Sequence, residues 1–298
     1  MRLAVMAAAA LAFAAAARAE EPCRLVRVAS LEISLDRYNR PTVPAMIEGH
    51  PARVLVDTGG VFSAIAPEWL AKNGIKSESL GGGAVYLWGG ARLNAIARVR
   101  SFELGKLSTG HMSFAVLPPN YGDPDVAASI GAEVLGAYDV DFDFAAGRLN
   151  LFRKNDCAER VIYWTADMWA VAPLRPTDDD HLVIDAQLDG KTLRAMIDTG
   201  ASDSVLNLDR ARGIFGWDSK TPLQSVATDV YRFPFKALSF DAVEVHNPSL
   251  ALVPDDRIGF SYSPREAPLL LGMNVLRNLH VYVSYGQHKV YFTAASAH

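Results

Sequence analysis

Apolar and polar positions along most of the chain follow the short-range patterns of β-strands. Leu31–Leu35 alternates with a period of two, and Val54–Val56 and Ala195–Ile197 are short apolar runs bounded by polar or glycine-rich turns. Such patterns are typical of half-buried and fully buried strands. Brief helical patterns occur at Pro67–Asn73, Glu133–Tyr138 and Asn274–Leu279. The sequence therefore predicts a mostly β protein.

The chain contains two copies of one module at a constant offset. The segment Ile47–Gly59 recurs as Leu188–Gly200, and Ile130–Leu135 recurs as Leu271–Leu276, so that 188 − 47 and 271 − 130 both equal 141. One short motif can match by chance, but two separate motifs at the same offset indicate a duplicated module. Between these motifs the offset falls to 136, where Ser113–Ala115 matches a later Ser-Leu-Ala segment. The copies thus differ in length in the loops around that strand.

The start of the chain, residues 1–19, has the features of a secretory signal peptide. A positive charge at Arg2 precedes the apolar stretch Leu3–Ala17, and a small-x-small site directly precedes Glu20. The apolar stretch is shorter than the roughly 20 residues that a spanning helix needs. We therefore expect residues 1–19 to be removed on export, to the periplasm in a Gram-negative source and otherwise into the medium, with no membrane insertion afterwards.

The duplication divides the rest of the chain into two lobes and a linker. We predict an N-terminal lobe at 20–155, a linker at 156–180 and a C-terminal lobe at 181–298. The linker carries four large apolar side chains, interpreted as cover for the seam between the lobes, with an exposed recognition patch as the alternative. These residues are Tyr163, Trp164, Met168 and Trp169. The run Asp178–His181 is interpreted as a solvated turn, because consecutive acids cannot all face one cation.

Charge and cysteine content narrow the classes of partner and cofactor. The formal net charge of −4 becomes −6 without the signal peptide, so neither nucleic acid nor an anionic membrane is an expected partner. Cys23 and Cys157 are expected to pair as a disulfide in an oxidising compartment, although two buried free thiols are the alternative. Two cysteines cannot complete a tetrahedral zinc site, and the seven histidines form no metal-binding motif. We expect no metal and no cofactor.

The same tripeptide follows an apolar strand in each copy. The two occurrences are Asp57-Thr58-Gly59 and Asp198-Thr199-Gly200. A single Asp-Thr-Gly is an ordinary turn sequence, but two of them, each followed by a later apolar-Gly motif, indicate a functional repeat. Two adjacent carboxyl groups that share one proton supply both the base and the acid that peptide hydrolysis needs. Glycine after each Asp-Thr pair permits a tight turn and lets backbone amides approach the carboxylates.

On these motifs the sequence resembles the pepsin and retroviral-type aspartic peptidases, especially bacterial retropepsin-like proteins. The resemblance implies a two-lobed, pseudo-two-fold acid-protease fold in which each lobe is a retropepsin-like β barrel. It implies that Asp57 and Asp198 are catalytic, and that Thr58 and Thr199 exchange hydrogen bonds across the axis. It further implies a peptide or protein substrate and an active monomer, since both half-sites lie in one chain. Ser129 departs from the family pattern, where an apolar residue is usual.

A flap over the substrate is expected in this family. The glycine-framed segment 81–90 is the candidate, with Tyr86 and Trp88 as substrate contacts. A phosphate-cradling loop is the rival interpretation, but no Lys-Ser or Lys-Thr pair follows the glycines. A plain flexible loop is the other alternative. The corresponding stretch of the second copy, Leu223–Phe235, lacks the glycine cluster, which predicts one dominant flap.

Two hypotheses for function follow. The first is an aspartic endopeptidase that activates water with Asp57 and Asp198. The second is a catalytically silent peptide-binding or regulatory module of the same fold in the cell envelope. Retention of two carboxylates that repel each other favours the enzyme. Many acid-adapted members carry a hydroxyl three residues after each catalytic aspartate, where this chain has Gly60 and Ala201. The missing donors predict a dyad that titrates at higher pH than in pepsin-like acid enzymes.

Overall fold

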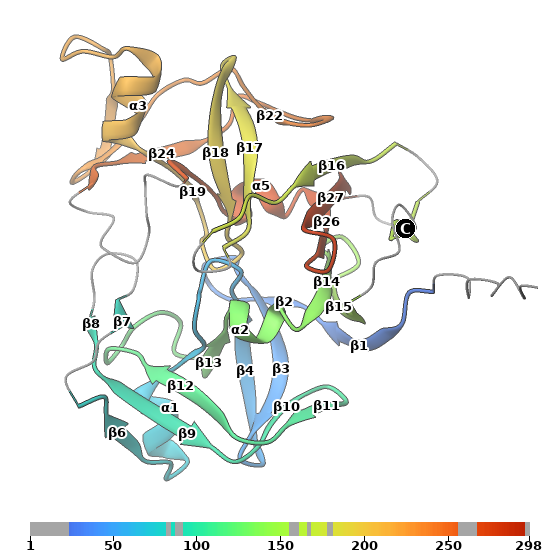
Figure 1. The fold of residues 1–298 in the computed structure, drawn as a ribbon. Helices are drawn as coiled ribbons and strands as arrows, with labels where there is room; N and C mark the ends of the chain where they lie inside the picture. Colours follow the sequence, from blue (N-terminus) through green and yellow to red (C-terminus); the bar gives the residue numbers. More distant parts are fainter. Residues whose placement is uncertain are drawn as a thin grey trace, which may run out of the picture.

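The computed structural model describes seven stretches of the chain. These are residues 24–81, 85–86, 92–154, 161–165, 168–177, 181–255 and 267–295. Most of them lie in β-strands, which form two lobes on either side of a shared sheet (Figure 1). This arrangement confirms the predicted mostly β, two-lobed fold. No helix in the described stretches is long and apolar enough to cross a membrane. The predicted signal peptide, Cys23, Cys157 and the acidic run Asp178–Asp180 lie outside the described residues.

A ten-stranded curled sheet forms the N-terminal lobe. Its path runs through β11 (Leu107–Thr109), β10 (Phe102–Leu104), β3 (Pro41–Ile47), β4 (His50–Val56), β13 (Ala128–Ile130), β5 (Ala64–Ile65), β12 (Met112–Val116), β9 (Ala95–Val99) and β6 (Ser77–Ser79), while β2 (Ser34–Leu35) pairs with β3. The apolar run Val54–Val56 ends β4 inside the lobe, where both of its valines are fully buried. The parallel neighbour β13 forms despite Ser129, which pairs with Leu55. The end of β4 is therefore held rigidly in the core.

A nine-stranded sheet repeats this design in the C-terminal lobe. Its order is β20 (Gln224–Ala227), β21 (Val230–Arg232), β24 (Leu250–Val253), β19 (Ser204–Asn207), β25 (Leu269–Leu271), β18 (Lys191–Ile197), β17 (Val183–Leu188), β22 (Ala237–Phe240) and β23 (Val243–His246). The copies also match in register. Ala115 of β12 pairs with Ala64, and Ala251 of β24 pairs with Val205. Ala115 and Ala251 are 136 positions apart in the sequence, and Ala64 and Val205 are 141 positions apart. These are the two offsets found in the sequence.

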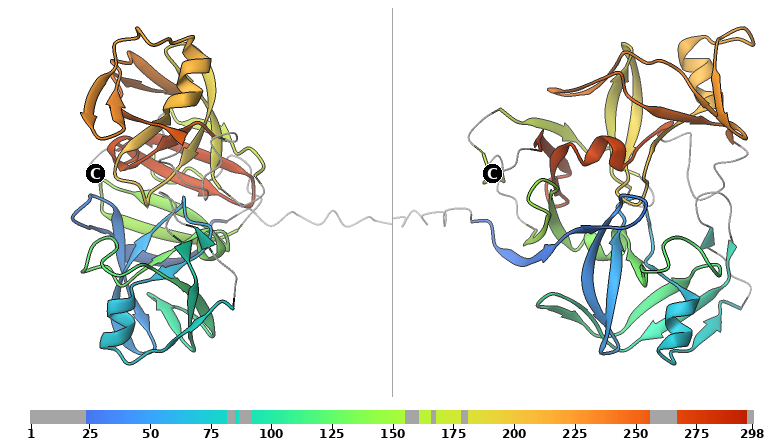
Figure 2. Two further views of the ribbon diagram at one scale, coloured as in Figure 1. Left: turned by 90° about the vertical axis from the view of Figure 1, so that its left-hand side faces the viewer. Right: turned by 180° about the vertical axis from the view of Figure 1, so that it is seen from behind.

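A six-stranded sheet between the lobes takes strands from both copies. Its order is β1 (Arg27–Glu32), β15 (Arg148–Arg153), β14 (Tyr138–Asp143), β26 (Leu279–Ser284), β27 (Lys289–Ala294) and β16 (Ala170–Pro173). At its centre β14 and β26 run antiparallel, and Asp141 pairs with Tyr282. Their numbers differ by 141, so each faces its own equivalent and the pseudo-two-fold axis passes between them. Two further views in Figure 2 show the lobes on either side of this sheet.

The linker aromatics cover this sheet only in part. The Trp164 ring stacks on His280 with 4.1 Å between centroids, and its indole N–H donates to Thr293. The Tyr163 hydroxyl donates to the buried Asp141 carboxylate at 2.5 Å. Both side chains pack on the shared sheet, although 45% of Tyr163 stays exposed. Trp169 and Met168 do not cover the seam, because they are 41% and 92% exposed.

Short helices border the lobes. They are α1 (Pro67–Lys72), α2 (Ala132–Leu135), α3 (Leu208–Phe215) and α5 (Met273–Leu276). The brief helical patterns predicted α1, α2 and α5, whereas α3 was not predicted. Its signals are present in the sequence: the Asn207 side chain accepts from the Arg210 amide at the N-terminus, and Gly216 ends the helix in the left-handed conformation with φ 67°.

Candidate active site

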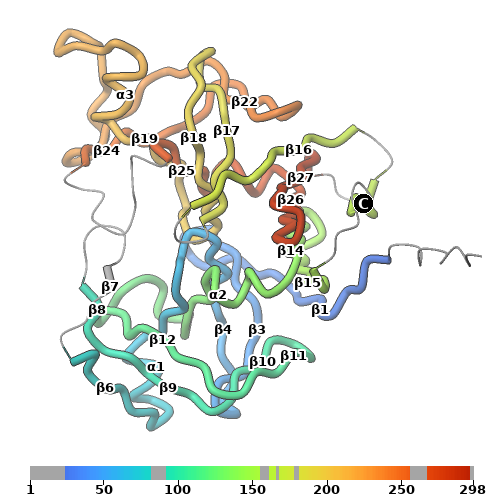
Figure 3. The backbone as a smooth tube through the Cα atoms, viewed as in Figure 1, coloured from blue at the N-terminus to red at the C-terminus, as the bar shows by residue number. Residues whose placement is uncertain are grey.

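The two Asp-Thr-Gly loops meet where the lobes touch. β4 and β18 each end directly before an aspartate, and Figure 3 shows the loops after these strands converging at the centre of the molecule. The backbone N–H of Asp57 donates to the Ile130 carbonyl at 3.0 Å, and that of Asp198 donates to the Leu271 carbonyl at 3.0 Å. Each aspartate is thus fixed to the parallel strand beside its own. The structure brings together both aspartates that the sequence singles out.

A glycine and a serine outside the Asp-Thr-Gly tripeptide support each active-site loop. Gly131 packs so closely on the Gly60 carbonyl that no side chain would fit, and Gly272 packs in the same way on the Asp203 carbonyl. The Ser63 hydroxyl accepts from the Gly131 amide at 3.1 Å, and the Ser204 hydroxyl accepts from the Gly272 amide at 3.0 Å. Sequence reasoning missed both serines. They follow the repeat offset, since 204 − 63 is 141, and this is the signal that could have identified them.

Thr58 and Thr199 interlock the two loops. Each threonine hydroxyl accepts from the backbone amide of the other threonine, at 3.1 and 3.0 Å. The Thr58 hydroxyl also donates to the Ile197 carbonyl at 2.8 Å, and the Thr199 hydroxyl donates to the Val56 carbonyl at 2.6 Å. Both side chains are almost fully buried. A buried network in which every donor has a partner holds the loops in one relative position.

The carboxyl groups of the aspartates face each other across the axis. Each packs against the glycine of the opposite loop, close enough for the two groups to influence each other's pKa. Asp57 also accepts from the amides of Gly59 and Gly60 at 3.0 and 2.9 Å, and Asp198 accepts from the Gly200 amide at 2.8 Å. A methyl group at Gly59 would collide with the Asp198 carboxyl, and one at Gly200 with the Asp57 carboxyl. Glycine is therefore required here for close approach, in addition to the tight turn.

The two carboxyl groups differ in their electrostatic environment. Removal from water raises the pKa of both, because burial disfavours the charged form. The amides of Gly59 and Gly60 oppose that rise at Asp57, as does the positive charge of Arg40. The pKa of Asp198 lies well above its usual range, because the charge of Asp57 adds to the effect of burial. The geometry thus suits a pair that holds one proton between two carboxylates.

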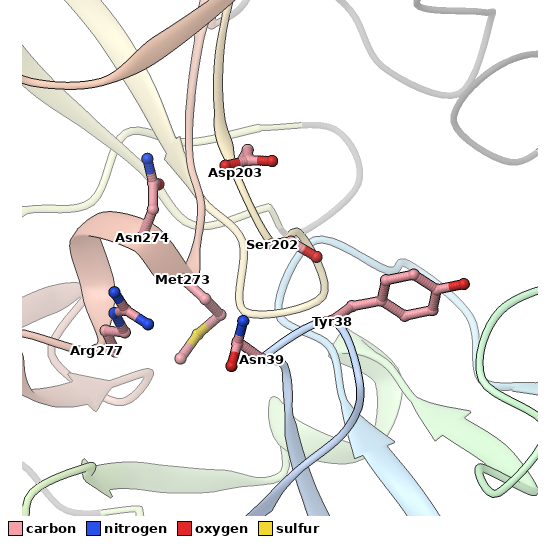
Figure 4. Close-up of a pocket in the computed structure, with 7 residues that line it drawn as sticks. All are labelled: Tyr38, Asn39, Ser202, Asp203, Met273, Asn274 and Arg277. Atoms are coloured by element: carbon pink, nitrogen blue, oxygen red, sulfur yellow. The ribbon is translucent and has the colours of Figure 1, made fainter.

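A cavity of about 380 Å³ borders the loop that follows Asp198 (Figure 4). Its walls come from the turn before β3 in one lobe, and from the active-site loop and α5 in the other. The lining residues are Tyr38, Asn39, Ser202, Asp203, Met273, Asn274 and Arg277. Neither Asp57 nor Asp198 lines it. The cavity therefore adjoins the candidate active site along the seam between the lobes.

The flap prediction is only partly within the described residues. Tyr86 lies in β7 (Val85–Tyr86), which pairs with β8 (Arg92–Leu93) as a short antiparallel hairpin. In the view of Figure 1 this hairpin lies on the opposite side of the molecule from the six-stranded sheet. Trp88 lies outside the described residues. The prediction that these two residues contact substrate stays a prediction.

Two lobes related by a pseudo-two-fold axis, with paired Asp-Thr-Gly loops at their junction, define the pepsin-like aspartic protease class. Residues 43–136 and 184–275 match the family model described as aspartyl protease. The chain belongs to the aspartyl protease family. No curated protein matches the sequence. Among solved structures, basic 7S globulin from soybean is similar with a TM-score of 0.53 and 12% identity, over 93% of this chain and 98% of that one.

Proposed function

We propose that the protein is an aspartic endopeptidase in which Asp57 and Asp198 activate a water molecule to attack a peptide bond. The observation that carries the proposal is the placement of two buried carboxyl groups side by side, each packed against the glycine of the opposite loop, in loops that the threonines interlock. Membership of the aspartyl protease family supports a peptidase. A binding module has no need of two carboxyl groups held this close at the cost of removing them from water.

In the proposed reaction each protonation state has its own task. The ionised carboxylate accepts a proton from water as the water attacks the peptide carbonyl carbon. The protonated carboxyl donates its proton to the carbonyl oxygen, which neutralises the developing negative charge. When the carbon–nitrogen bond breaks, the protonated carboxyl donates its proton to the leaving amine. The other carboxylate takes up a proton from a hydroxyl of the tetrahedral intermediate as the new carboxylic acid forms, so the dyad again holds one proton. No step needs a metal or an organic cofactor.

Exposed aromatic side chains near the loops support an extended peptide with apolar residues as substrate. Phe62, which closely follows Asp57 in the chain, is 58% exposed. The side chain of Tyr121 is also partly exposed. Burial of its hydroxyl raises the pKa, opposed by the charge of Arg40 and assisted by the charges of Asp57 and Asp198. We further propose that the protein acts after export, as a monomer, because both half-sites belong to one chain.

The proposal is tested by incubating the purified protein with a diverse peptide library, with and without a transition-state-mimicking inhibitor of aspartic peptidases. Asp57→Asn protein is the matched control, because it keeps the fold and removes one carboxylate. Cleavage that the inhibitor blocks and the control lacks is the expected result. Absence of inhibitor-sensitive cleavage across a broad pH range would favour the alternative, a peptide-binding module of the same fold.

A further inference from the structure

Two basic side chains at equivalent positions reach across the seam between the lobes. Arg40 directly precedes β3 and His181 lies just before β17, and their numbers differ by the repeat offset of 141. The Arg40 Nη1 donates to the Gly200 carbonyl at 3.4 Å. The His181 Nε2 lies 3.0 Å from the Gly59 carbonyl, and donates to it because a carbonyl only accepts. Each side chain thus contacts the active-site glycine of the opposite lobe.

These two glycines pack directly against the carboxyl groups of the catalytic aspartates. Gly200 packs against the Asp57 carboxyl and Gly59 packs against the Asp198 carboxyl, too closely for any side chain. A residue that holds the Gly200 carbonyl therefore fixes the backbone beside Asp57. Arg40 does so with a positive charge on that side of the dyad. A displacement of about 1 Å in such a site costs about 100-fold in rate.

Arg40 and His181 are each contacted by the residue four positions before them in the chain. The buried Asp36 carboxylate accepts from the Arg40 Nε at 2.8 Å and forms an ion pair with its Nη2 at 2.7 Å. The Thr177 hydroxyl donates to the His181 backbone carbonyl at 3.3 Å. Asp36 and Thr177 follow the same offset, since 177 − 36 is 141. Arg40 and His181 therefore occupy equivalent positions of the duplicated module, although one is an arginine and the other a histidine.

Resting on the endopeptidase function proposed above, we propose that Arg40 and His181 are positioning residues that hold the two active-site loops in register. We also propose that the permanent charge of Arg40 makes Asp57 the ionised member of the resting dyad. An arginine is charged at every working pH, whereas a histidine is charged only in sufficiently acid solution. The lobes therefore differ in the charge that they present to their catalytic carboxyl groups.

The surrounding charges agree with this assignment. Burial raises the pKa of Asp57, and the amides of Gly59 and Gly60 and the charge of Arg40 oppose that rise. Burial and then the negative charge of Asp57 raise the pKa of Asp198. The charged and titratable groups that face Arg40 are Asp36, which pairs with it, the ring of Tyr38 at 5.1 Å, and Tyr121 and Asp57, which its charge reaches. These four groups are acidic or neutral, so Arg40 supplies the positive charge in this cluster.

Carboxyl titration by carbon-13 NMR tests the assignment without relying on activity. Purified protein with labelled aspartate is compared with Arg40→Met and Arg40→Lys, and the signals of Asp57 and Asp198 are identified by their loss in Asp57→Asn and Asp198→Asn. We expect Asp57 to ionise first, its titration to move to higher pH in Arg40→Met, and Arg40→Lys to restore it. Arg100→Met is the matched control, because Arg100 pairs with Glu48 on the surface. An unmoved Asp57 titration in Arg40→Met, or Asp198 ionising first, would overturn the assignment.

The positioning role is tested at the second member of the pair. His181→Arg places a permanent cation beside Asp198, so the basic limb of the kcat/KM profile should move to lower pH. His181→Gln keeps a donor to Gly59 and should stay within about threefold of wild-type kcat/KM, whereas His181→Ala should lose about 10-fold or more. Equal activity of His181→Ala and His181→Gln would overturn the positioning role. Wild type that cleaves no peptide would overturn the endopeptidase function and the positioning role that rests on it, whereas the NMR titration, which needs no turnover, would still decide the charge assignment.

Discussion

Thr58 and Thr199 exchange amide-to-hydroxyl hydrogen bonds in both directions, at 3.1 and 3.0 Å, although they lie in different copies of the repeat. The exchange has a structural consequence. Each hydroxyl also donates to a strand carbonyl of the opposite lobe, so the strand that presents one aspartate is tied to the loop of the other. The relative position of the two carboxyl groups therefore depends on these two hydroxyl groups.

Thr199→Val should destabilise the protein, whereas Thr199→Ser should be close to wild type. Valine has a similar shape but leaves the Thr58 amide and the Val56 carbonyl without their partner. Each unsatisfied buried group costs about 1–3 kcal/mol. We expect the free energy of unfolding, measured in urea, to fall by about 2 kcal/mol or more. Equal stability of the valine and serine variants would show that the hydroxyl does not hold the loops.

Asp57→Asn or Asp198→Asn should abolish turnover and leave the fold intact. Each carboxyl group has its own proton transfer, and residues that act as a unit lose nearly all activity with the first change. We expect kcat to fall by about 10⁴-fold or more in each variant, with no further loss in the double variant. The measurement is inhibitor-sensitive cleavage, with circular dichroism as the check on folding. Substantial activity in either single variant would place the chemistry elsewhere.

The raised pKa of Asp198 also predicts a dependence of stability on pH. A carboxyl whose folded-state pKa is raised holds its proton after the unfolded chain has lost it. The stability this provides is complete below the unfolded value of about 4, and is lost as the pH rises through the folded-state pKa. Asp198→Asn has no such loss, so its melting temperature should exceed that of wild type at neutral pH.

The advantage of Asp198→Asn should shrink toward pH 4, where the wild-type carboxyl is protonated. Asp125→Asn is the matched control, because Asp125 is exposed on a loop. Its melting temperature should follow that of wild type at both pH values. An advantage of Asp198→Asn that is the same at pH 4 and pH 7 would contradict the burial argument.

The sequence was informative where the two copies repeat, and less so where single residues act. The Asp-Thr-Gly loops, the apolar strands before them and the later glycines recur at one offset, so the lobes and the dyad could be predicted. Ser63, Arg40 and His181 follow the same offset, but isolated polar residues do not stand out without the contacts that explain them.

The shared sheet between the lobes was harder to predict, because strand pairing across the chain leaves no local pattern. The alternating segment Leu31–Leu35 was expected to be one strand. In the structure its first two residues end β1 in the shared sheet, whereas Ser34 and Leu35 form β2 on the N-terminal lobe. Local alternation predicts strands correctly here, but it does not specify which sheet each strand joins.

Cys23 and Cys157 are predicted to form a disulfide that ties the start of the mature chain to the end of the first repeat. Closure of so long a loop stabilises by on the order of 4 to 5 kcal/mol at most in the chain-entropy model. Cys23→Ser and Cys157→Ser should each lower stability, and the double variant should lose no more than either one. Mass spectrometry that finds two alkylated thiols in protein exported to an oxidising compartment would contradict the pairing.

The dyad should work at higher pH than in pepsin-like acid enzymes. Burial raises the pKa of both carboxyl groups, and the positions three residues later, Gly60 and Ala201, offer no hydroxyl to stabilise the charged forms. The singly ionised dyad exists between the two pKa values, so raising both moves the working range upward. We expect kcat/KM to follow a bell-shaped profile that peaks in weakly acidic to neutral solution.

Ala201→Ser tests this argument directly, because it adds a donor beside Asp198. A hydrogen bond to the charged carboxylate lowers its pKa, so the basic limb of the kcat/KM profile should move to lower pH. Ala146→Ser is the matched control, since Ala146 lies on an exposed turn and its hydroxyl would reach neither carboxyl. The argument from the missing hydroxyls fails if Ala201→Ser leaves both limbs where they are. It also fails if wild type works only in strongly acid solution, because the raised pKa values would then have no effect on the reaction.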